Sequence, residues 1–199
     1  MSINPLVFTL AFTSGFIIMA IELLGGRILS PYFGSSVYVW GSIISVFMIS
    51  LSAGYLAGGR LSLNQPNLTR YGGFYILAAF TLLPTILFAD EVMDSVFLRI
   101  EDPRYGSLVA SAFLFFVPIA ILGMIAPYSV RLLVEDSHRS GHVAGILYFV
   151  STFGSAIGTL MTSFYFVLWF EVNQILMAMS AVLLLGGMSS ITFHQFNKN

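Results

Sequence analysis

Residues 5–29 read PLVFTLAFTSGFIIMAIELLGGRIL, a stretch in which Glu22 and Arg27 are the only charged side chains. A bilayer core about 30 Å thick needs roughly 20 consecutive apolar residues per spanning helix. The stretch is long enough, and it does not alternate apolar and polar residues as the strands of a membrane barrel do. No basic leader precedes it and no small-x-small cleavage site follows it, so we interpret it as a retained first span rather than a signal peptide.

Five more stretches share this character, and charge is scarce throughout. Of the 199 residues, 57% are hydrophobic and 9% are charged, whereas a soluble domain averages about 25% charged residues. Too few charges remain to cover a water-exposed surface, which excludes a soluble fold. The sequence predicts an all-α integral membrane protein, a single transmembrane domain over 1–199 folded as a six-helix bundle. The later spans are predicted at 38–59, 72–89, 107–133, 143–170 and 173–193.

Basic residues are divided unequally between the two sides of the predicted membrane. Cytoplasmic loops carry an excess of Lys and Arg, so the side with more of them is the inner side. The odd-numbered connections carry Arg27, Arg99 and Arg104. The even-numbered connections and the C-terminus carry Arg60, Arg70, Arg131, Arg139 and Lys198. This bias predicts that both termini are cytoplasmic.

The third connection, residues 90–106, combines acids with apolar residues at helical spacing. The pattern predicts a short amphipathic helix over about 90–102, lying on the outer membrane surface. The alternative is a solvated loop whose apolar residues are incidental. The apolar positions are Val92, Met93, Val96, Phe97 and Ile100.

Two spans carry features that membrane helices use to associate, namely paired glycines and a polar stripe. The glycine pairs, Gly54-x-x-x-Gly58 and Gly154-x-x-x-Gly158, indicate either dimerisation or packing within one bundle, and we favour packing. The fifth span has a stripe that either lines a polar cavity or hydrogen-bonds to neighbouring helices, and we favour hydrogen bonding. Its members are Tyr148, Thr152, Ser155, Thr159 and Thr162, and Ser151 and Ser163 flank it.

A weak internal repeat is visible between the two halves. Pro31-Tyr32 follows the first span and Pro127-Tyr128 lies late in the fourth, and we expect each pair to end a helix. Each is followed by a span with a glycine pair. Three spans per unit would make the halves inverted relative to each other, so the pattern suggests a three-plus-three inverted repeat, as in many transporters.

Glu22 is the outstanding candidate site residue. A charged group near the centre of a spanning helix costs roughly 2.5–3.5 kcal/mol on insertion scales, so it needs a partner, a water-filled cavity or protonation. Arg27 is five residues away, which is about 140° around a helix, so contact requires unwinding at Gly25-Gly26. The hydroxyls of the fifth span are the other possible partners. Glu22 therefore indicates a cation or proton site, or a structural buried pair.

The segment after Arg27 is dense in special residues. Pro31 is expected to end the first helix, and the aromatic residues suit a membrane interface. This predicted outer motif comprises Pro31, Tyr32, Gly34, Ser35, Ser36 and Trp40.

Few other side chains point to chemistry. The chain has no cysteine, and His138 and His142 lack an obvious third metal ligand. No nucleophile–base pair, phosphate-binding loop or nucleic-acid patch is present in the sequence. We therefore expect no enzyme activity, cofactor, metal or nucleic-acid partner.

Several motifs resemble the membrane domain of bacterial spermidine-synthase-like proteins. The resemblance covers about residues 20–160 and lacks any counterpart of the soluble aminopropyltransferase domain found in many members. Its motifs are Glu22-x-x-x-Gly26-Arg27-x-Leu29-x-Pro31-Tyr32-Phe33-Gly34-Ser35-Ser36-x-x-x-Trp40-Gly41, Gly54-Tyr55-x-x-Gly58-Gly59-Arg60, Gly123-Met124-x-x-Pro127-Tyr128-x-x-Arg131-Leu132 and Tyr148-x-x-Ser151-Thr152-x-Gly154-Ser155-x-x-Gly158-Thr159.

The resemblance implies a membrane module of the bacterial inner membrane linked to polyamine or S-adenosylmethionine metabolism. Such a module would move a cationic solute or dock a separate soluble synthase-like partner. The alternative is a structural accessory subunit packed against a larger membrane complex. The bilayer, a second copy of the chain and a larger complex are accordingly its expected partners.

Overall fold

A computed structural model describes residues 3–134 and 139–196, and over these residues it is helical without strands. Six helices are long and apolar enough to cross a membrane, which confirms the predicted all-α six-helix fold and makes the chain a multi-pass membrane protein. The elements are α1 (Ile3–Phe33), α2 (Val37–Leu61), α3 (Leu68–Phe97), α4 (Pro103–Gly123), α5 (Ile125–Leu133), α6 (Ser140–Met161), the π-helix η2 (Thr162–Phe166), α7 (Val167–Trp169) and α8 (Val172–Phe196). The fourth span combines α4 with α5, and the fifth combines α6, η2 and α7.

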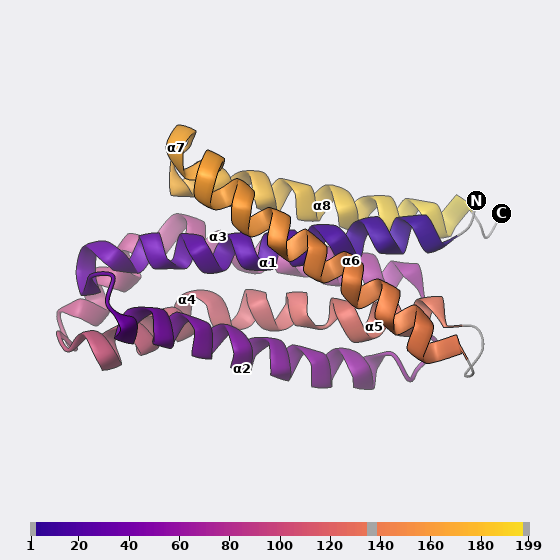
Figure 1. The fold of residues 1–199 in the computed structure, drawn as a ribbon, viewed down its shortest axis with the longest axis horizontal. Helices are drawn as coiled ribbons and strands as arrows, with labels where there is room; N and C mark the ends of the chain where they lie inside the picture. Colours follow the sequence, from indigo (N-terminus) through magenta and orange to yellow (C-terminus); the bar gives the residue numbers. More distant parts are fainter. Residues whose placement is uncertain (1–2, 135–138, 197–199) are drawn as a thin grey trace.

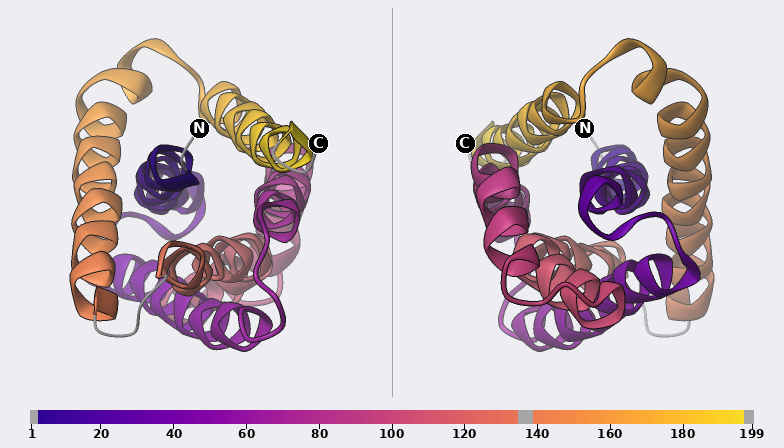
Figure 2. Two further views of the ribbon diagram at one scale, coloured as in Figure 1. Left: turned by 90° about the vertical axis from the view of Figure 1, so that its right-hand side faces the viewer. Right: turned by 90° about the vertical axis from the view of Figure 1, so that its left-hand side faces the viewer.

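The helices run along one common long axis (Figure 1). Figure 2 shows the other spans arranged around α1, which contacts all five of them. Both ends of the chain lie at one end of the bundle, which we call the terminal end. The opposite end holds the α1–α2 turn, the α3–α4 connection and the start of α8, and we call it the Arg27 end.

The first helix ends at a glycine rather than at its proline. Helix α1 continues through Pro31 to Phe33, and Gly34 follows with φ 76° and donates its N–H to the Ser30 carbonyl at 2.9 Å. A left-handed residue after a helix is a common terminator, and glycine adopts it without a Cβ penalty. The prediction that Pro31 ends the helix is therefore wrong by two residues.

The second Pro-Tyr pair does not end a helix either. The fourth span breaks at Met124, and Pro127 lies in the first turn of α5, where a missing N–H costs nothing. Tyr128 is buried, and its hydroxyl accepts the backbone N–H of Asn67 at 3.1 Å, at the start of α3. The pair thus positions the beginning of the third span.

The acidic connection is the end of α3. The helix kinks at Phe88 (φ −128°, ψ 16°) and continues to Phe97. Beyond the kink, Met93 and Val96 are buried while Asp90 and Asp94 are exposed, so the segment is amphipathic. It differs from the prediction in being continuous with the third span and in ending before Ile100.

The glycine pair of α2 packs on the fourth span. A Cβ placed at Gly54 would overlap the carbonyl of Ala120, and one at Gly58 would overlap the backbone of Met124. Small residues allow this close backbone approach in membrane proteins. The second and fourth spans run in the same direction, because Gly54 and Gly58 meet successive turns in ascending order.

The glycine pair of α6 makes the corresponding contact with α1. Gly154 meets the backbone of Phe12, and Gly158 meets that of Phe16, again with the two helices running in the same direction. The two packed pairs are spans two and four and spans one and five. If each span of the first half is matched to its counterpart in the second half, so that span one corresponds to span four and span two to span five, one pair is converted into the other. The matched helices run in opposite directions in the bundle (Figure 1). Both features fit a three-plus-three inverted arrangement.

A polar cluster is buried where α3 meets α5. The Tyr71 hydroxyl lies 2.7 Å from Ser129 Oγ and 3.3 Å from the Tyr75 hydroxyl, and Ser129 donates to the Ile125 carbonyl at 2.7 Å. All three side chains are buried, and the rings of Tyr71 and Tyr128 stack. These polar groups are satisfied inside the bundle, as burial requires.

Candidate functional site

Glu22 is half-buried, near the middle of the continuous helix α1. Within the described part of the chain it makes no hydrogen bond and no ion pair. The helix does not unwind at Gly25-Gly26, so Arg27 points away from it. Glu22 is thus a potentially charged group in a spanning helix with no partner among the described residues.

The neighbours of Glu22 along one strip of α1 show where it faces. Residues four or seven apart share a helix face, so Gly15 and Gly26 lie on the same strip as Glu22. Gly15 packs against Ser151 of α6, and Gly26 packs against the Trp40 ring of α2. Glu22 therefore lies on the side of α1 that α6 and α2 flank.

The polar stripe of α6 borders the same side. Ser155 donates to the Gly15 carbonyl of α1 at 3.1 Å, and Thr159 donates to the Ser155 carbonyl at 2.9 Å. Thr152 and Tyr148 are exposed, the latter by 54%. The stripe thus contributes to helix packing at Ser155, while Thr152 and Tyr148 remain exposed on its outer side.

Tyrosines from α2 and α6 approach each other beside this stripe. The phenol groups of Tyr55 and Tyr148 lie close enough to interact electrostatically, and both side chains are about half exposed. We call the resulting surface the Glu22 face. It is a long strip with Glu22 toward the Arg27 end, Thr159 and Ser155 in the middle, and Thr152, Tyr148 and Tyr55 toward the terminal end.

The polar stripe ends at a buried, unpaired hydroxyl. Thr162 is the first residue of the π-helix, and its Oγ1 is buried without a hydrogen-bond partner in the described chain. A π-helix inside a spanning helix is uncommon and often accompanies function.

Arg27 has a structural contact of its own. Its guanidinium donates to the Val167 carbonyl at 3.3 Å, at the point where the fifth span ends. The last carbonyls of a helix lack intrahelical partners, and a cation there is favourable. Arg27 therefore helps to terminate the fifth span.

The predicted outer motif forms the corner between α1 and α2. Gly34, Ser35 and Ser36 are exposed in the turn, and Trp40 packs on Gly26. Tyr32 packs edge-on against Phe97, with its hydroxyl beside Asp94. The segment joins α1 to the end of α3 and does not reach the Glu22 face through its turn residues.

The two histidines form no described metal site. His142 is exposed, and His138 lies outside the described residues. No group of three potential metal ligands occurs among the residues that the structure describes.

A charged pocket at the Arg27 end was not expected from the sequence. Arg27 shares a cavity of about 350 Å³ with Asp90 of α3 and with Glu171 and Asn173 near the start of α8. The one feature of the sequence that could have indicated it is Glu171, a lone charged residue in the short connection between two apolar spans. Its proximity to Asp90 depends on the tertiary fold.

Comparison with known proteins gives no relative. No protein-family model, no curated protein and no solved structure matches the chain.

Proposed function

We propose that this chain is a non-catalytic membrane protein that binds a second membrane-spanning protein through the Glu22 face. One observation carries the proposal: Glu22 lies in a spanning helix, half-exposed, without a hydrogen-bond or ion-pair partner in the described chain. A carboxylate facing lipid is costly, whereas polar groups on spanning helices hold neighbouring helices together. A partner helix with a cation or a hydrogen-bond donor at this depth would remove the cost.

The exposure of the fifth span supports this proposal. It is the least buried of the six spans, and α6 buries Leu147, Gly154 and Gly158. Its outward aromatic residues include Phe149 and Phe153, which are 67% and 52% exposed. Tyrosine is enriched among interface hot spots, and Tyr148 on the same span is 54% exposed.

The partner is better matched by a different protein than by a second copy. The described basic side chains lie at or near helix ends, and Arg27 is already bound to the Val167 carbonyl. A second copy in the same orientation would therefore bring no cation to the depth of Glu22. This favours the accessory-subunit role, in a larger complex of the bacterial inner membrane with both termini cytoplasmic.

Site-specific photo-crosslinking tests the proposal. A photoreactive residue at Thr152 lies on the Glu22 face, and one at Met188 lies on the exposed side of α8. We expect Thr152 to crosslink one membrane protein in native membranes and Met188 not to do so. Glu22→Gln should abolish the Thr152 product without lowering the amount of chain. An undiminished product in the Glu22→Gln variant would overturn the proposal.

A second candidate function is binding of a cationic solute such as a polyamine. The observation that favours it is a row of hydroxyls on the fifth span, Ser155, Thr159 and Thr162, which runs along α1 up to the level of Glu22, together with the family resemblance. Polyamine uptake by proteoliposomes containing the purified chain tests it. Uptake that disappears in Glu22→Gln supports transport, and its absence in the wild type contradicts transport.

The resemblance also suggests docking of a soluble synthase-like protein. Such a protein would meet the terminal end, where Arg60, Arg70 and Arg131 are exposed. A photoreactive residue at Arg70 distinguishes this arrangement, because it would crosslink a soluble protein rather than a membrane protein.

A further inference from the structure

We propose that the chain holds one phospholipid with both a phosphate and a primary ammonium group, at a site separate from the Glu22 face. The site combines an apolar pocket along α1 and α8 with the charged pocket at the Arg27 end. The two adjoin at the start of α8, where Phe170 and Gln174 line the apolar pocket and the residues between them, 171–173, line the charged one.

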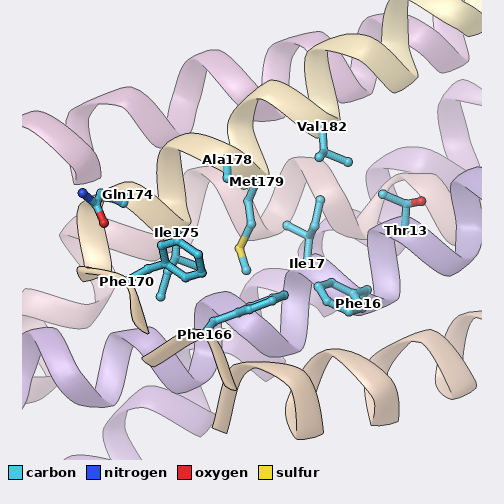
Figure 3. Close-up of a pocket in the computed structure, with 10 residues that line it drawn as sticks. All are labelled: Thr13, Phe16, Ile17, Phe166, Phe170, Gln174, Ile175, Ala178, Met179 and Val182. Carbon is cyan, nitrogen blue, oxygen red and sulfur yellow. The ribbon is translucent and has the colours of Figure 1, made fainter. Parts of the chain in front are cut away.

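The apolar pocket has a volume of about 520 Å³ and lies between α1, the end of the π-helix, Phe170 and α8. Figure 3 shows Phe16, Ile17, Phe166 and Met179 around it, with Gln174 at one end and Thr13 and Val182 at the other. The described lining is almost entirely hydrocarbon and aromatic, as in sites for apolar ligands. In a bilayer the spanning helices are surrounded by lipid, so an acyl chain is the group available to fill such a pocket.

The length of the pocket matches one leaflet of a bilayer. Gln174 and Val182 are eight residues apart on α8, which is about 12 Å along a helix. One leaflet contributes about 15 Å of hydrocarbon. An acyl chain laid along the pocket would therefore span most of one leaflet and end beside the charged pocket.

The charged pocket supplies both signs of charge at the headgroup end. Arg27 presents a guanidinium with five N–H donors, of which one binds the Val167 carbonyl. Guanidinium groups match phosphate oxygens in a bidentate manner. Asp90 and Glu171 line the same cavity and are exposed. Their carboxylates accept hydrogen bonds from an ammonium group, and Asn173 adds an amide.

This charge pattern selects a headgroup class. An anionic headgroup without a cation, such as glycerol phosphate, would satisfy Arg27 and leave two carboxylates beside it unpaired. A choline headgroup carries a cation that cannot donate hydrogen bonds. Phosphatidylethanolamine offers a phosphate for Arg27 and three N–H donors for the two carboxylates. We therefore assign the site to that class of lipid.

Native mass spectrometry of the full chain tests the assignment. The purified, delipidated chain is incubated with equal amounts of phosphatidylethanolamine, phosphatidylcholine and phosphatidylglycerol with the same 16-carbon chains. We expect one retained lipid, predominantly phosphatidylethanolamine. Equal retention of phosphatidylethanolamine and phosphatidylglycerol by the wild type would overturn the proposal.

Matched tryptophan variants locate the acyl chain. Ala178 lines the pocket, while Ala181, one turn along α8, is exposed and outside the described lining. Ala178→Trp should lower retention of all three lipids about tenfold, and Ala181→Trp should leave it unchanged. Equal retention in the two variants would rule out the pocket as the lipid site.

Headgroup variants provide a test that does not alter the packed interior. The double change Asp90→Asn and Glu171→Gln affects exposed side chains and should remove the preference for phosphatidylethanolamine over phosphatidylglycerol. Arg27→Gln should lower retention of both phospholipids about tenfold or more, because a charge-assisted contact is lost. An unchanged preference in the double variant contradicts the assigned headgroup, whatever the behaviour of Ala178→Trp. None of these changes alters Glu22, so failure here leaves the proposed partner binding untouched.

Discussion

The Tyr71 cluster and the Glu22 face are both polar regions among spanning helices, and they differ in whether the bundle satisfies them. Tyr71, Tyr75 and Ser129 are buried and bonded to one another. Glu22 is half-exposed and has no partner within the described chain. Polar groups that stabilise a membrane bundle are paired inside it. An unpaired one on the outside is better explained by an interaction with another molecule than by folding.

The sharpest way to break this comparison is to remove the carboxyl group from the Glu22 face. Glu22→Leu should raise the free energy of unfolding of the isolated chain, by up to about 2.5 kcal/mol, because an intramembrane carboxyl is removed. The same substitution should abolish the Thr152 crosslink to the partner. Unfolding by denaturant in mixed micelles measures the first effect. A destabilised isolated chain would mean that Glu22 is part of the internal packing.

The next largest effect is expected at the close helix contacts. They sharpen the comparison because they show how much free energy of unfolding is lost when packing inside the bundle is disturbed. Gly158→Ala places a Cβ against the Phe16 carbonyl, so overpacking should lower the free energy of unfolding by about 1–3 kcal/mol. Gly145→Ala in the same helix is the matched control, since nothing lies within 4 Å of its Cβ. The control should be neutral or slightly stabilising, because alanine has the higher helix propensity. Similar losses in both variants would contradict the assigned α1–α6 contact.

The architecture was predictable from the sequence because it depends on local properties. Runs of apolar residues separated by charged connections define six spans whatever their packing. Glu22 was also identifiable, since a charged residue well inside such a run stands out. The ends of the helices were less predictable. Pro31 and Pro127 are tolerated inside helices, one in a last turn and one in a first turn, and the terminators are Gly34 and the break at Met124.

The contacts between distant segments could not be predicted. Nothing in the sequence pairs Asp90 with Glu171, because their proximity depends on the α3–α8 contact and on the turn after the π-helix. The glycine pairs indicated close approach without saying to which helix. The role of Arg27 was also hidden, since the Val167 carbonyl becomes available only where the fifth span ends. These features require the tertiary structure.

A smaller effect is expected inside the Tyr71 cluster. Tyr71→Phe removes the hydrogen bond to Ser129 and the contact with the Tyr75 hydroxyl while keeping the ring. The free energy of unfolding should fall by about 1 kcal/mol, as for a typical buried hydrogen bond. Tyr148→Phe on the Glu22 face is the control and should leave the isolated chain unchanged. Denaturant unfolding of the two variants compares the regions directly, and equal losses would show that Tyr148 is also bonded within the bundle.

The smallest effect is expected at the edge of the Glu22 face. Thr152 is exposed on α6, beside the half-buried hydroxyls of Ser155 and Thr159. Thr152→Ala should not change the unfolding of the isolated chain, because no described packing depends on its hydroxyl. Against the partner it should weaken binding by about 0.6 kcal/mol, the average for a polar contact between membrane helices. Competition between tagged wild-type and variant chains for the partner resolves such a difference. Because the same hydroxyl faces lipid when the chain is alone, an effect confined to the complex would place the partner on this face.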